Sequence, residues 1–375
     1  MRPFFFAKFQ PPYTGMTIAT ETFADLIDDK VDVARINTSY GRICPDEVGI
    51  EWMKYYVRFA GQLAGAYTSL RRRLQQSSCD VFYFVASPSV LGHWRNRVAL
   101  EIARPHVCRV VAHVHNGNFP DVFEQFGTSH SSKRMTELVD TFTPSNSTVS
   151  EQMGRYVPDS KRRVVHSTID EKVRCTDVEV ENKITERRSR PLRVLYLSNM
   201  IETKGYRDVA KAVEQFNTNG GGEATVDFVG DWPSPQAQHR FEEEVEEFAY
   251  ADEIHIHGRV TNRSRIRQMM LDADVFVLPT YYPNEAQPIA IIEAMNAGTP
   301  VIATRHASIP EYVFDDENGY LVDKKSPTQI ERSLQVLSDS SNWVEKARAA
   351  RRTYKEMFSP AAVRGQMLSA LKGSV

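Results

Sequence analysis

The stretch Glu285-Ala-Gln-Pro-Ile-Ala-Ile-Ile-Glu293 decides the fold expected for this chain of 375 residues. It follows the apolar run Val275-Phe-Val-Leu278, which predicts a buried strand. It then leads through Pro288, expected as the first helical residue, into an apolar helix that ends at Gly298. The run Val301-Ile-Ala-Thr304 predicts the next parallel strand. This strand, loop, helix and strand form an α/β unit, in which ligands bind beyond the carboxyl ends of the strands.

Two carboxylates lie eight positions apart around the start of this helix. Glu285 is expected in the loop, and Glu293 just inside the helix among apolar neighbours. A carboxylate in such surroundings needs polar partners, because burial without them is costly. A ligand rich in hydroxyl groups would provide such partners, and a structural salt bridge is the alternative for Glu293.

Further motifs accompany this segment in a fixed order. They are Leu195-Tyr-Leu-Ser-Asn-Met-Ile-Glu-Thr-Lys204-Gly205, Val226-Asp-Phe-Val-Gly230-Asp231, Ile256-His-Gly258-Arg259-Val260, Ile309-Pro-Glu311 and Asn318-Gly319-Tyr-Leu-Val322. Together they resemble the family-4 retaining glycosyltransferases. The resemblance is specific over residues 192 to 325 and looser over the first 170. It implies the GT-B fold, which has two Rossmann-like doubly wound parallel-sheet domains facing across a cleft.

The chain divides into two α/β domains in this interpretation. Residues 1–175 form the N-terminal, acceptor-side domain, and residues 192–357 form the donor-binding domain. Residues 176–191 are charged and mostly lack an apolar period, which indicates an exposed linker. The resemblance places a last helix, within residues 358–375, back on the first domain.

The donor diphosphate is assigned to Lys204. This lysine precedes Gly205 at an expected helix start, where free backbone N–H groups and the helix dipole favour a phosphate. A solvated loop lysine is the alternative. Asn199 stands where the family usually has an arginine, so Arg259 is a candidate to supply charge instead. The resemblance also implies donor contacts near Gly15, Gly230 and Gln287.

The resemblance gives three residues more specific roles. Glu293 binds the ribose hydroxyls of the donor, for which the two oxygens of a carboxylate are suited. Glu285 approaches the transferred sugar as a hydroxyl ligand or as a stabiliser of positive charge. His115, in His113-Val-His115-Asn116-Gly117, follows an inner strand and faces the donor. The alternative for both histidines is a satisfied place in the core, and this is the stronger interpretation of His113.

Composition narrows the class of protein. The net charge is −2 with no basic stripe, so nucleic acid is not an expected partner. Four cysteines without paired spacing indicate neither zinc nor a disulfide framework, and a reducing compartment fits best. No signal peptide or membrane span is expected, which favours the cytoplasm. No metal or other cofactor is expected either, since Asp272-Ala-Asp274 directly precedes a core strand.

One helical segment indicates a second possible location. Residues 52–76 carry an apolar stripe of Tyr55, Phe59, Leu63, Ala66, Leu70 and Leu74, with three arginines at positions 71–73. The stripe packs on the chain's own sheet or rests on anionic lipid, which would place the protein at the inner face of a membrane.

The predicted function is that of a retaining, metal-independent glycosyltransferase. Its donor is a nucleoside diphosphate sugar, and its acceptor is a hydroxyl group on a saccharide or a lipid-linked molecule, in the assembly of polysaccharides, glycolipids or other glycoconjugates. A sugar-nucleotide epimerase of the same fold and a non-catalytic nucleotide-sugar-binding subunit are the alternatives. A nicotinamide dehydrogenase is disfavoured, because no Gly-x-Gly-x-x-Gly follows the first strand of either domain.

Overall fold

The computed structural model describes residues 1–10, 15–28, 30–39, 50–76, 79–187 and 191–373. The chain forms two compact units. The first contains residues 1–168 and 360–375, and the second contains residues 169–359. The boundary therefore lies between Thr168 and Ile169, a few residues before the expected end of the first domain.

The first unit is built on a five-stranded parallel sheet in the order β2-β1-β3-β4-β5. Every residue of β1 and β3 is buried, as expected for inner strands covered on both faces. The order reverses between β1 and β3, so two crossover connections leave this point in opposite directions. The strands are β1 (Pro3–Ala7), β2 (Ala34–Asn37), β3 (Val81–Val85), β4 (Arg109–Val114) and β5 (Thr141–Pro144).

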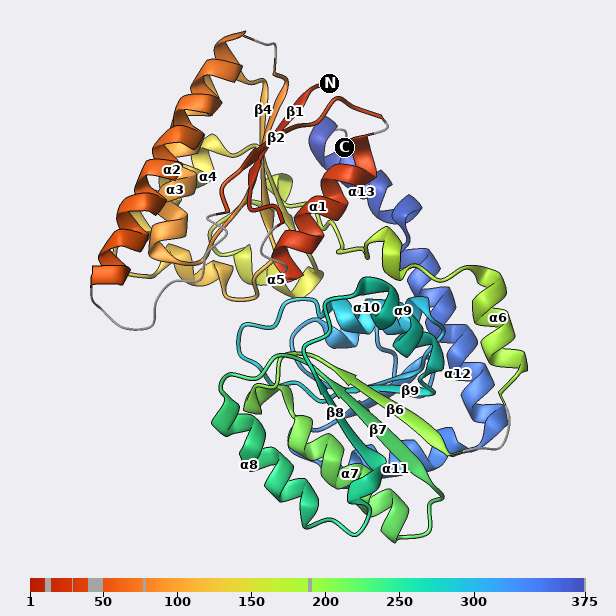
Figure 1. Ribbon diagram of the computed structural model, residues 1–375. Coiled ribbons are helices and arrows are strands. Elements are labelled where there is room, and N and C mark those ends of the chain that lie inside the picture. Colours follow the sequence, from red (N-terminus) through yellow and green to blue (C-terminus); the bar gives the residue numbers. More distant parts are fainter. Residues whose placement is uncertain (11–14, 29, 40–49, 77–78, 188–190, 374–375) are drawn as a thin grey trace. The chain divides into compact units, whose positions relative to one another are not determined.

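Helices cover both faces of this sheet. Figure 1 shows α2, α3 and α4 on one face, and α1 with α13 on the other. The final helix, α13, is part of the first unit, where Arg364 Nε donates to the carbonyl oxygen of Leu26 at 2.7 Å. The helices are α1 (Gly15–Asp28), α2 (Ile50–Gln76), α3 (Val90–Ala103), α4 (Ser129–Leu138), α5 (Ser147–Met153) and α13 (Pro360–Lys372).

The second unit contains a six-stranded parallel sheet in the order β11-β10-β9-β6-β7-β8. Counted from its own first strand, this is the Rossmann order 3-2-1-4-5-6 seen from the other edge, with the reversal between β6 and β9. The strands are β6 (Leu192–Leu197), β7 (Ala224–Val229), β8 (Ile254–Gly258), β9 (Val275–Leu278), β10 (Val301–Thr304) and β11 (Gly319–Val322).

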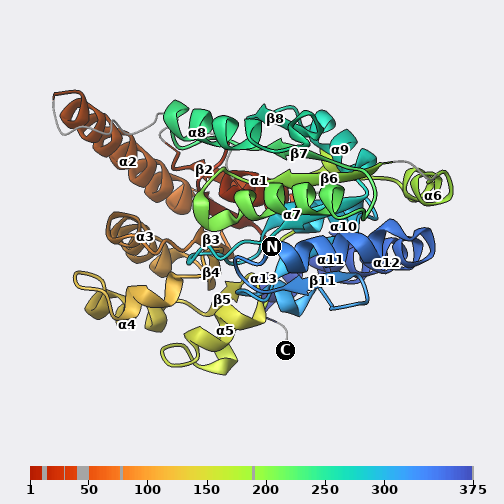
Figure 2. The ribbon, with the colours of Figure 1, turned by 90° about the horizontal axis from the view of Figure 1, so that it is seen from below.

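The helices of the second unit also form two layers. Figure 1 shows α9 and α10 on one face of the sheet and α7, α8 and α11 on the other, and Figure 2 shows α11 beside α12. Pro288 precedes α10 as its N-cap rather than occupying the first helical position. The helices are α6 (Asp177–Thr185), α7 (Tyr206–Thr218), α8 (Pro235–Glu246), α9 (Arg263–Asp272), α10 (Ile289–Asn296), α11 (Pro327–Ser338) and α12 (Ser340–Thr353).

The segment expected as a linker, residues 176–191, is part of the second unit and is mostly helical. Residues 177–185 form α6, which begins with a capping box between Thr176 and Glu179. Val180 and Ile184, one helical turn apart, are buried in the core of the second unit. Two apolar residues at this spacing are enough to dock a short helix, although they are too few to produce a visible period.

The apolar stripe of α2 packs on the chain's own sheet in its C-terminal half, where Ala66, Leu70 and Leu74 are buried in the core of the first unit. At the other end of α2, Ile50, Met53 and Val57 are exposed. Within the described ranges, no helix is both long and apolar enough to cross a bilayer.

The connection from β6 to α7 depends on a glycine. Gly205 has a φ of 77°, and a Cβ atom built there would lie 2.6 Å from the carbonyl oxygen of Pro279. Gly220 has a similar φ of 75° but has open space around its Cβ position. We expect Gly205→Ala to lower the free energy of unfolding of the second unit by about 1–3 kcal/mol more than Gly220→Ala, because only the first adds a steric clash.

Urea titration of the two variants measures this difference. Since both substitutions place alanine at a positive φ, the shared backbone cost cancels between them. Equal midpoints for Gly205→Ala and Gly220→Ala would contradict the close approach of these two loops.

Candidate functional site

The strand reversal of the second sheet carries an ion pair. Lys204 lies in the connection after β6, and Glu285 lies in the connection after the neighbouring strand β9. Lys204 Nζ lies 2.5 Å from Glu285 Oε2, and both side chains are largely buried. The structure therefore brings together two residues that are 81 positions apart in the sequence, at the edge of the sheet where ligands of this fold bind.

Neighbouring side chains fix the geometry of this pair. The hydroxyl of Thr280 donates to the same oxygen, Glu285 Oε2, at 3.0 Å. The amine of Lys204 also lies over the ring of Tyr282, 4.9 Å from its centroid. Among the described residues, Glu285 Oε1 has no donor, so one oxygen of this carboxylate is available to a ligand.

The helix that follows Lys204 presents free backbone donors. Gly205 occupies the N-cap of α7 in the left-handed conformation, and no side chain caps this helix. Within the described part of the chain, the backbone amides of Tyr206 and Arg207 have no acceptor. The amine of Lys204 and the positive end of α7 together form a setting suited to an anion.

The loop from β9 to α10 is held by contacts that sequence reasoning missed. The backbone amide of Tyr281 donates to the carbonyl oxygen of Thr203 at 2.7 Å. His306 Nε2 lies 2.8 Å from the carbonyl oxygen of Tyr282, and Ser308 Oγ donates to that of Ala286. The only signal in the sequence is that His306 and Ser308 follow β10, whose carboxyl end reaches the same edge of the sheet.

Glu293 lies in a buried charged chain. It is 3% exposed, and its Oε1 pairs with Arg263, the first residue of α9. Arg263 Nε also pairs with Asp170 Oδ2 at 2.7 Å. Burial raises the pKa of Glu293, and Arg263 offsets only part of this effect. No described residue donates to Oε2 of Glu293, which leaves that atom for a further partner.

The other residues expected near the donor differ in their surroundings. The side chain of Asn199 is exposed after β6, Arg259 pairs with Asp231 at 3.3 Å, and Gln287 is buried. Gly230 has a structural reason to be glycine, because a Cβ atom there would lie 1.8 Å from the carbonyl oxygen of Ser198. The connections after β6 and β7 touch at this point.

His115 and Gly15 belong to the first unit. The ring of His115 stacks on that of His113, with centroids 4.0 Å apart, and His113 Nδ1 lies 2.8 Å from the hydroxyl of Tyr83. Burial lowers the pKa of His115 to about 4, so its ring is neutral at pH 7. Its Nε2 has no partner among the described residues. Gly15 begins α1, and residues 11–14 of the loop before it lie outside the described residues.

Asp274, in the Asp272-Ala-Asp274 motif, is 2% exposed and supports the sheet. Its Oδ2 accepts from the backbone amide of Arg193 at 2.9 Å, while its own amide donates back to the carbonyl oxygen of Arg193 at 2.8 Å. It thus ties the start of β9 to the start of β6. Over the described ranges, no group of three or more His, Cys, Asp or Glu side chains has the arrangement to hold a metal ion. Cys79, Cys108 and Cys175 are free thiols, and Cys44 lies outside the described residues.

Residues 177–356 match the family model described as glycosyl transferases group 1. This part of the chain is therefore similar to the group 1 glycosyl transferases. The match includes α6 and the strand reversal that carries Lys204 and Glu285.

The curated relatives of this part of the chain are distant in sequence. WcaL of Escherichia coli K12, named for colanic acid biosynthesis, is 26% identical over 194 residues, which are 48% of this chain and 45% of that protein. The N-acetyl-alpha-D-glucosaminyl L-malate synthase of Bacillus anthracis is 25% identical over 222 residues, 57% and 54% of the two chains. The chain therefore spans about half the length of these relatives.

Solved structures extend the similarity to both units. Anabaena HepE, crystallised with UDP, matches with a TM-score of 0.74 over 100% of both chains at 15% identity. Sucrose-phosphate synthase from Thermosynechococcus elongatus also gives 0.74, over 100% of this chain and 99% of that one, at 16% identity. The predicted fold class, two α/β domains with parallel sheets of the GT-B type, is confirmed.

Three histidines of the first unit make its stability depend on pH. Burial lowers the pKa of His93 and His115 to about 4, and it lowers the pKa of His113 well below its usual value. Between pH 6.5 and 4 the unfolded chain therefore binds protons that the folded chain does not. This contribution to stability is complete above pH 6.5. As the pH decreases below 6.5, the free energy of unfolding falls by up to about 1.4 kcal/mol per pH unit for each histidine.

Urea titrations at pH 7 and pH 5 test this dependence. We expect His115→Gln to lose less stability between the two pH values than the wild type. His130→Gln, which changes an exposed histidine of the same unit, is the control and should keep the wild-type dependence. Identical pH dependence in wild type and His115→Gln would contradict the neutral state of this ring.

Proposed function

We propose that this protein transfers a sugar from a nucleoside diphosphate sugar to a hydroxyl acceptor. The observation that carries the proposal is the ion pair of Lys204 and Glu285 at the strand reversal, beside the uncapped start of α7. A diphosphate needs cationic and N–H donors, and a sugar needs oxygen acceptors, so this pair offers both chemistries within one small region. The match of residues 177–356 to the group 1 glycosyl transferases supports the same assignment.

The ion pair also supplies a mechanism for donor binding. Phosphate oxygens compete with Glu285 Oε2 for the amine of Lys204, because one ammonium group serves both anions. Binding of the diphosphate then frees the carboxylate of Glu285 to face the sugar. There it accepts a hydroxyl hydrogen bond or stabilises the positive charge that develops at the anomeric carbon as the diphosphate leaves.

The ribose is assigned to Glu293 as part of this proposal. Its Oε1 is held by Arg263, and its Oε2 is the atom proposed to accept from a ribose hydroxyl. In this arrangement Arg263 fixes the orientation of the carboxylate. Burial raises the pKa of Glu293, and the positive charge of Arg263 favours the ionised carboxylate against this effect. His115 is proposed to donate from its neutral ring to a sugar hydroxyl or phosphate.

The reaction is proposed to retain the configuration of the sugar. An oxygen of the leaving phosphate would assist deprotonation of the acceptor on the same face of the sugar. Lys204 and α7 take the role of neutralising the diphosphate, so no metal is assigned to the step. Uridine donors come first in the search for substrates, because HepE is crystallised with UDP-glucose. The relative WcaL, named for colanic acid biosynthesis, supports polysaccharide assembly as the process.

Peripheral contact with an anionic membrane is a further part of the proposal. It rests on Ile50, Met53 and Val57, which follow helical spacing and are 58% to 69% exposed. Flotation with anionic liposomes at low salt tests it, and absence of the protein from the lipid fraction would remove it.

The site assignment is tested with Lys204→Met. We expect this variant to bind UDP about 10–100-fold more weakly than the wild type, because a charge-assisted hydrogen bond contributes about 1.5–3 kcal/mol. Lys211→Met, on α7, is the control and should bind UDP like the wild type. Calorimetric titration measures both, and equal affinity of the two variants would refute the role of Lys204.

Turnover of UDP-sugars distinguishes the proposed transfer from its alternatives. We analyse products after incubation with the donor alone and with a panel of saccharide acceptors. Sugar found on an acceptor supports the transferase. An epimer formed from the donor alone would support an epimerase, and binding without any product would support a non-catalytic subunit.

A further inference from the structure

The first unit has its own pocket at the reversal of its own sheet. The pocket has a volume of about 200 Å³, and its lining includes Lys8 after β1 and Val85 to Ser87 at the end of β3. These are the two strands between which the strand order reverses. The pocket therefore occupies the place where open parallel sheets bind ligands. It lies in the first unit, whereas Lys204 and Glu285 belong to the second unit.

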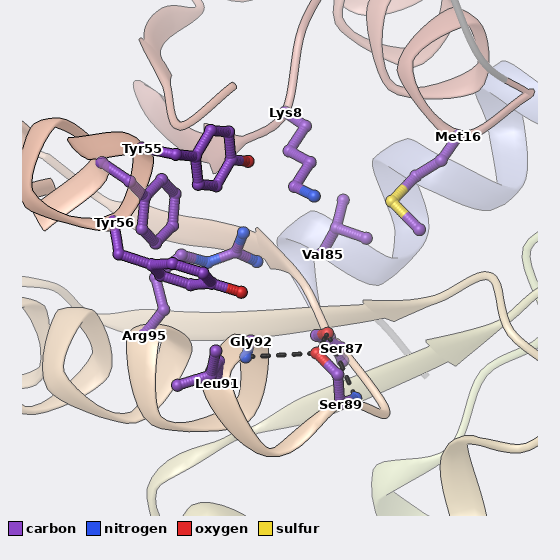
Figure 3. A pocket seen from close by; sticks show the side chains of 12 residues that line it. Lys8, Met16, Tyr55, Tyr56, Val85, Ser87, Ser89, Leu91, Gly92 and Arg95 are labelled. Atoms are coloured by element: carbon purple, nitrogen blue, oxygen red, sulfur yellow. Dashed lines mark hydrogen bonds between the residues drawn. The ribbon is translucent and has the colours of Figure 1, made fainter. Parts of the chain in front are cut away.

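Two cations face this pocket, and no acid of the described residues pairs with either of them. Figure 3 shows the side chains of Lys8 and Arg95 directed into the same space. Arg95 is 8% exposed, and within the described ranges its guanidinium donates only to the amide oxygen of Asn96, at 2.9 and 3.0 Å. Among the described residues, no carboxylate lies within ion-pair distance of Lys8 or Arg95. A buried guanidinium without an anion is costly, so an anionic ligand would offset this cost.

The charges of these two groups influence each other. Burial lowers the pKa of Arg95 to about 10. Burial also lowers the pKa of Lys8, and the charge of Arg95 lowers it further. Two neighbouring cations repel each other, which destabilises the fold. An oxyanion placed between them would interact favourably with both charges.

The start of α3 adds neutral donors to the same pocket. Ser89 caps this helix of 14 residues by accepting from the amide of Gly92 at 3.2 Å, and the hydroxyl of Ser87 lies 3.1 Å from that of Ser89. A Cβ atom at position 92 would lie 2.1 Å from Ser87 Oγ, so glycine is needed there for Ser87 to reach the helix start. The amides of Val90 and Leu91 have no acceptor among the described residues. Of this helix start, Ser89 and Leu91 line the pocket together with Lys8 and Arg95.

Aromatic rings form the opposite wall. Tyr55 and Tyr56 of α2 are half-buried and point toward the pocket in Figure 3, and Phe59 lies one turn further along, stacked on Tyr55. Such rings present large apolar faces with a polar tip, which suits a ligand that has an apolar face and hydroxyl groups. A sugar ring has this chemistry, and an inorganic anion alone does not.

We propose that this pocket binds an acidic saccharide, with its phosphate or carboxylate between Lys8, Arg95 and the start of α3 and its sugar ring against Tyr55 and Tyr56. This ligand is the acceptor, or the acidic part of the acceptor, of the transfer reaction, and that identification rests on the proposed function. The binding itself does not, because all of these groups belong to the first unit.

The binding test compares the wild-type chain with Lys8→Met, Lys8→Arg and Lys30→Met. Lys30 is an exposed lysine of the same unit outside the pocket. The probes are glucose 6-phosphate, glucuronate, neutral glucose and inorganic phosphate, measured by calorimetric titration. We expect at least one acidic sugar to bind the wild type on the order of tenfold or more tightly than glucose and than inorganic phosphate. Lys8→Met should lose this advantage, while Lys8→Arg and Lys30→Met keep it.

Four results would overturn the proposal. The first is an affinity for acidic sugars that Lys8→Met leaves unchanged. The second is a wild-type affinity for glucose equal to that for the acidic sugars, and the third is a wild-type affinity for inorganic phosphate as high as that for glucose 6-phosphate. The fourth is failure of the wild type to bind any of these anions.

A UDP titration of the same variants separates this proposal from the proposed function. Lys8→Met should bind UDP within about twofold of the wild type, because Lys204 and α7 belong to the second unit. Loss of acidic-sugar binding with UDP binding retained supports the pocket and leaves the transferase assignment intact. Acidic-sugar binding in a wild-type protein that binds no UDP would support the pocket and remove the transferase assignment.

Discussion

The ion pair between Lys204 and Glu285 connects the fold of the second unit to its proposed chemistry. It joins the loops after β6 and β9, the two strands between which the sheet order reverses. The approach of the two loops requires glycine at position 205, because its φ is 77° and a Cβ atom there would lie 2.6 Å from the carbonyl oxygen of Pro279. A largely buried ammonium and carboxylate stabilise each other in place, and each remains able to exchange its partner for a group on a ligand.

Charged groups are balanced differently in the two units. In the second unit the buried charges near the sheet edge form pairs, Lys204 with Glu285 and Arg263 with both Glu293 and Asp170. In the first unit, Lys8 and Arg95 face a pocket without a described carboxylate. The paired arrangement suits a ligand that carries both an anion and hydroxyl groups, while the unpaired one favours a net negative ligand.

The sequence predicted the second sheet well, because its strands are short apolar runs separated by helices and turn residues. It also predicted that Lys204 and Glu285 each lie in a loop that follows a strand. The structure adds that the two side chains pair, which no local pattern contains, because 81 residues separate them. The partner of Glu293 was missed for the same reason: Arg263 lies 30 residues earlier, at the start of another helix.

Other features were hidden by weak local signals. The helix α6 was taken for a linker because only Val180 and Ile184 face the core. The pocket of the first unit was not predicted, since Lys8, Arg95 and Tyr55 come from three separate segments that only the tertiary fold brings together. The stacking of His115 on His113 likewise depends on the burial of β4. The sequence indicated that this strand is buried, but it did not show which histidine nitrogens lack hydrogen-bond partners among the described residues.

The most direct test of the exchange of partners at Lys204 is a double-mutant cycle on UDP affinity, measured by calorimetry in wild type, Lys204→Met, Glu285→Gln and the double variant. Glu285→Gln should bind UDP more tightly than the wild type, because the amine of Lys204 no longer has a competing carboxylate. In the Lys204→Met background the same substitution should have little effect, which gives a coupling energy of about 0.5–3 kcal/mol. Equal effects of Glu285→Gln in the two backgrounds would contradict the account.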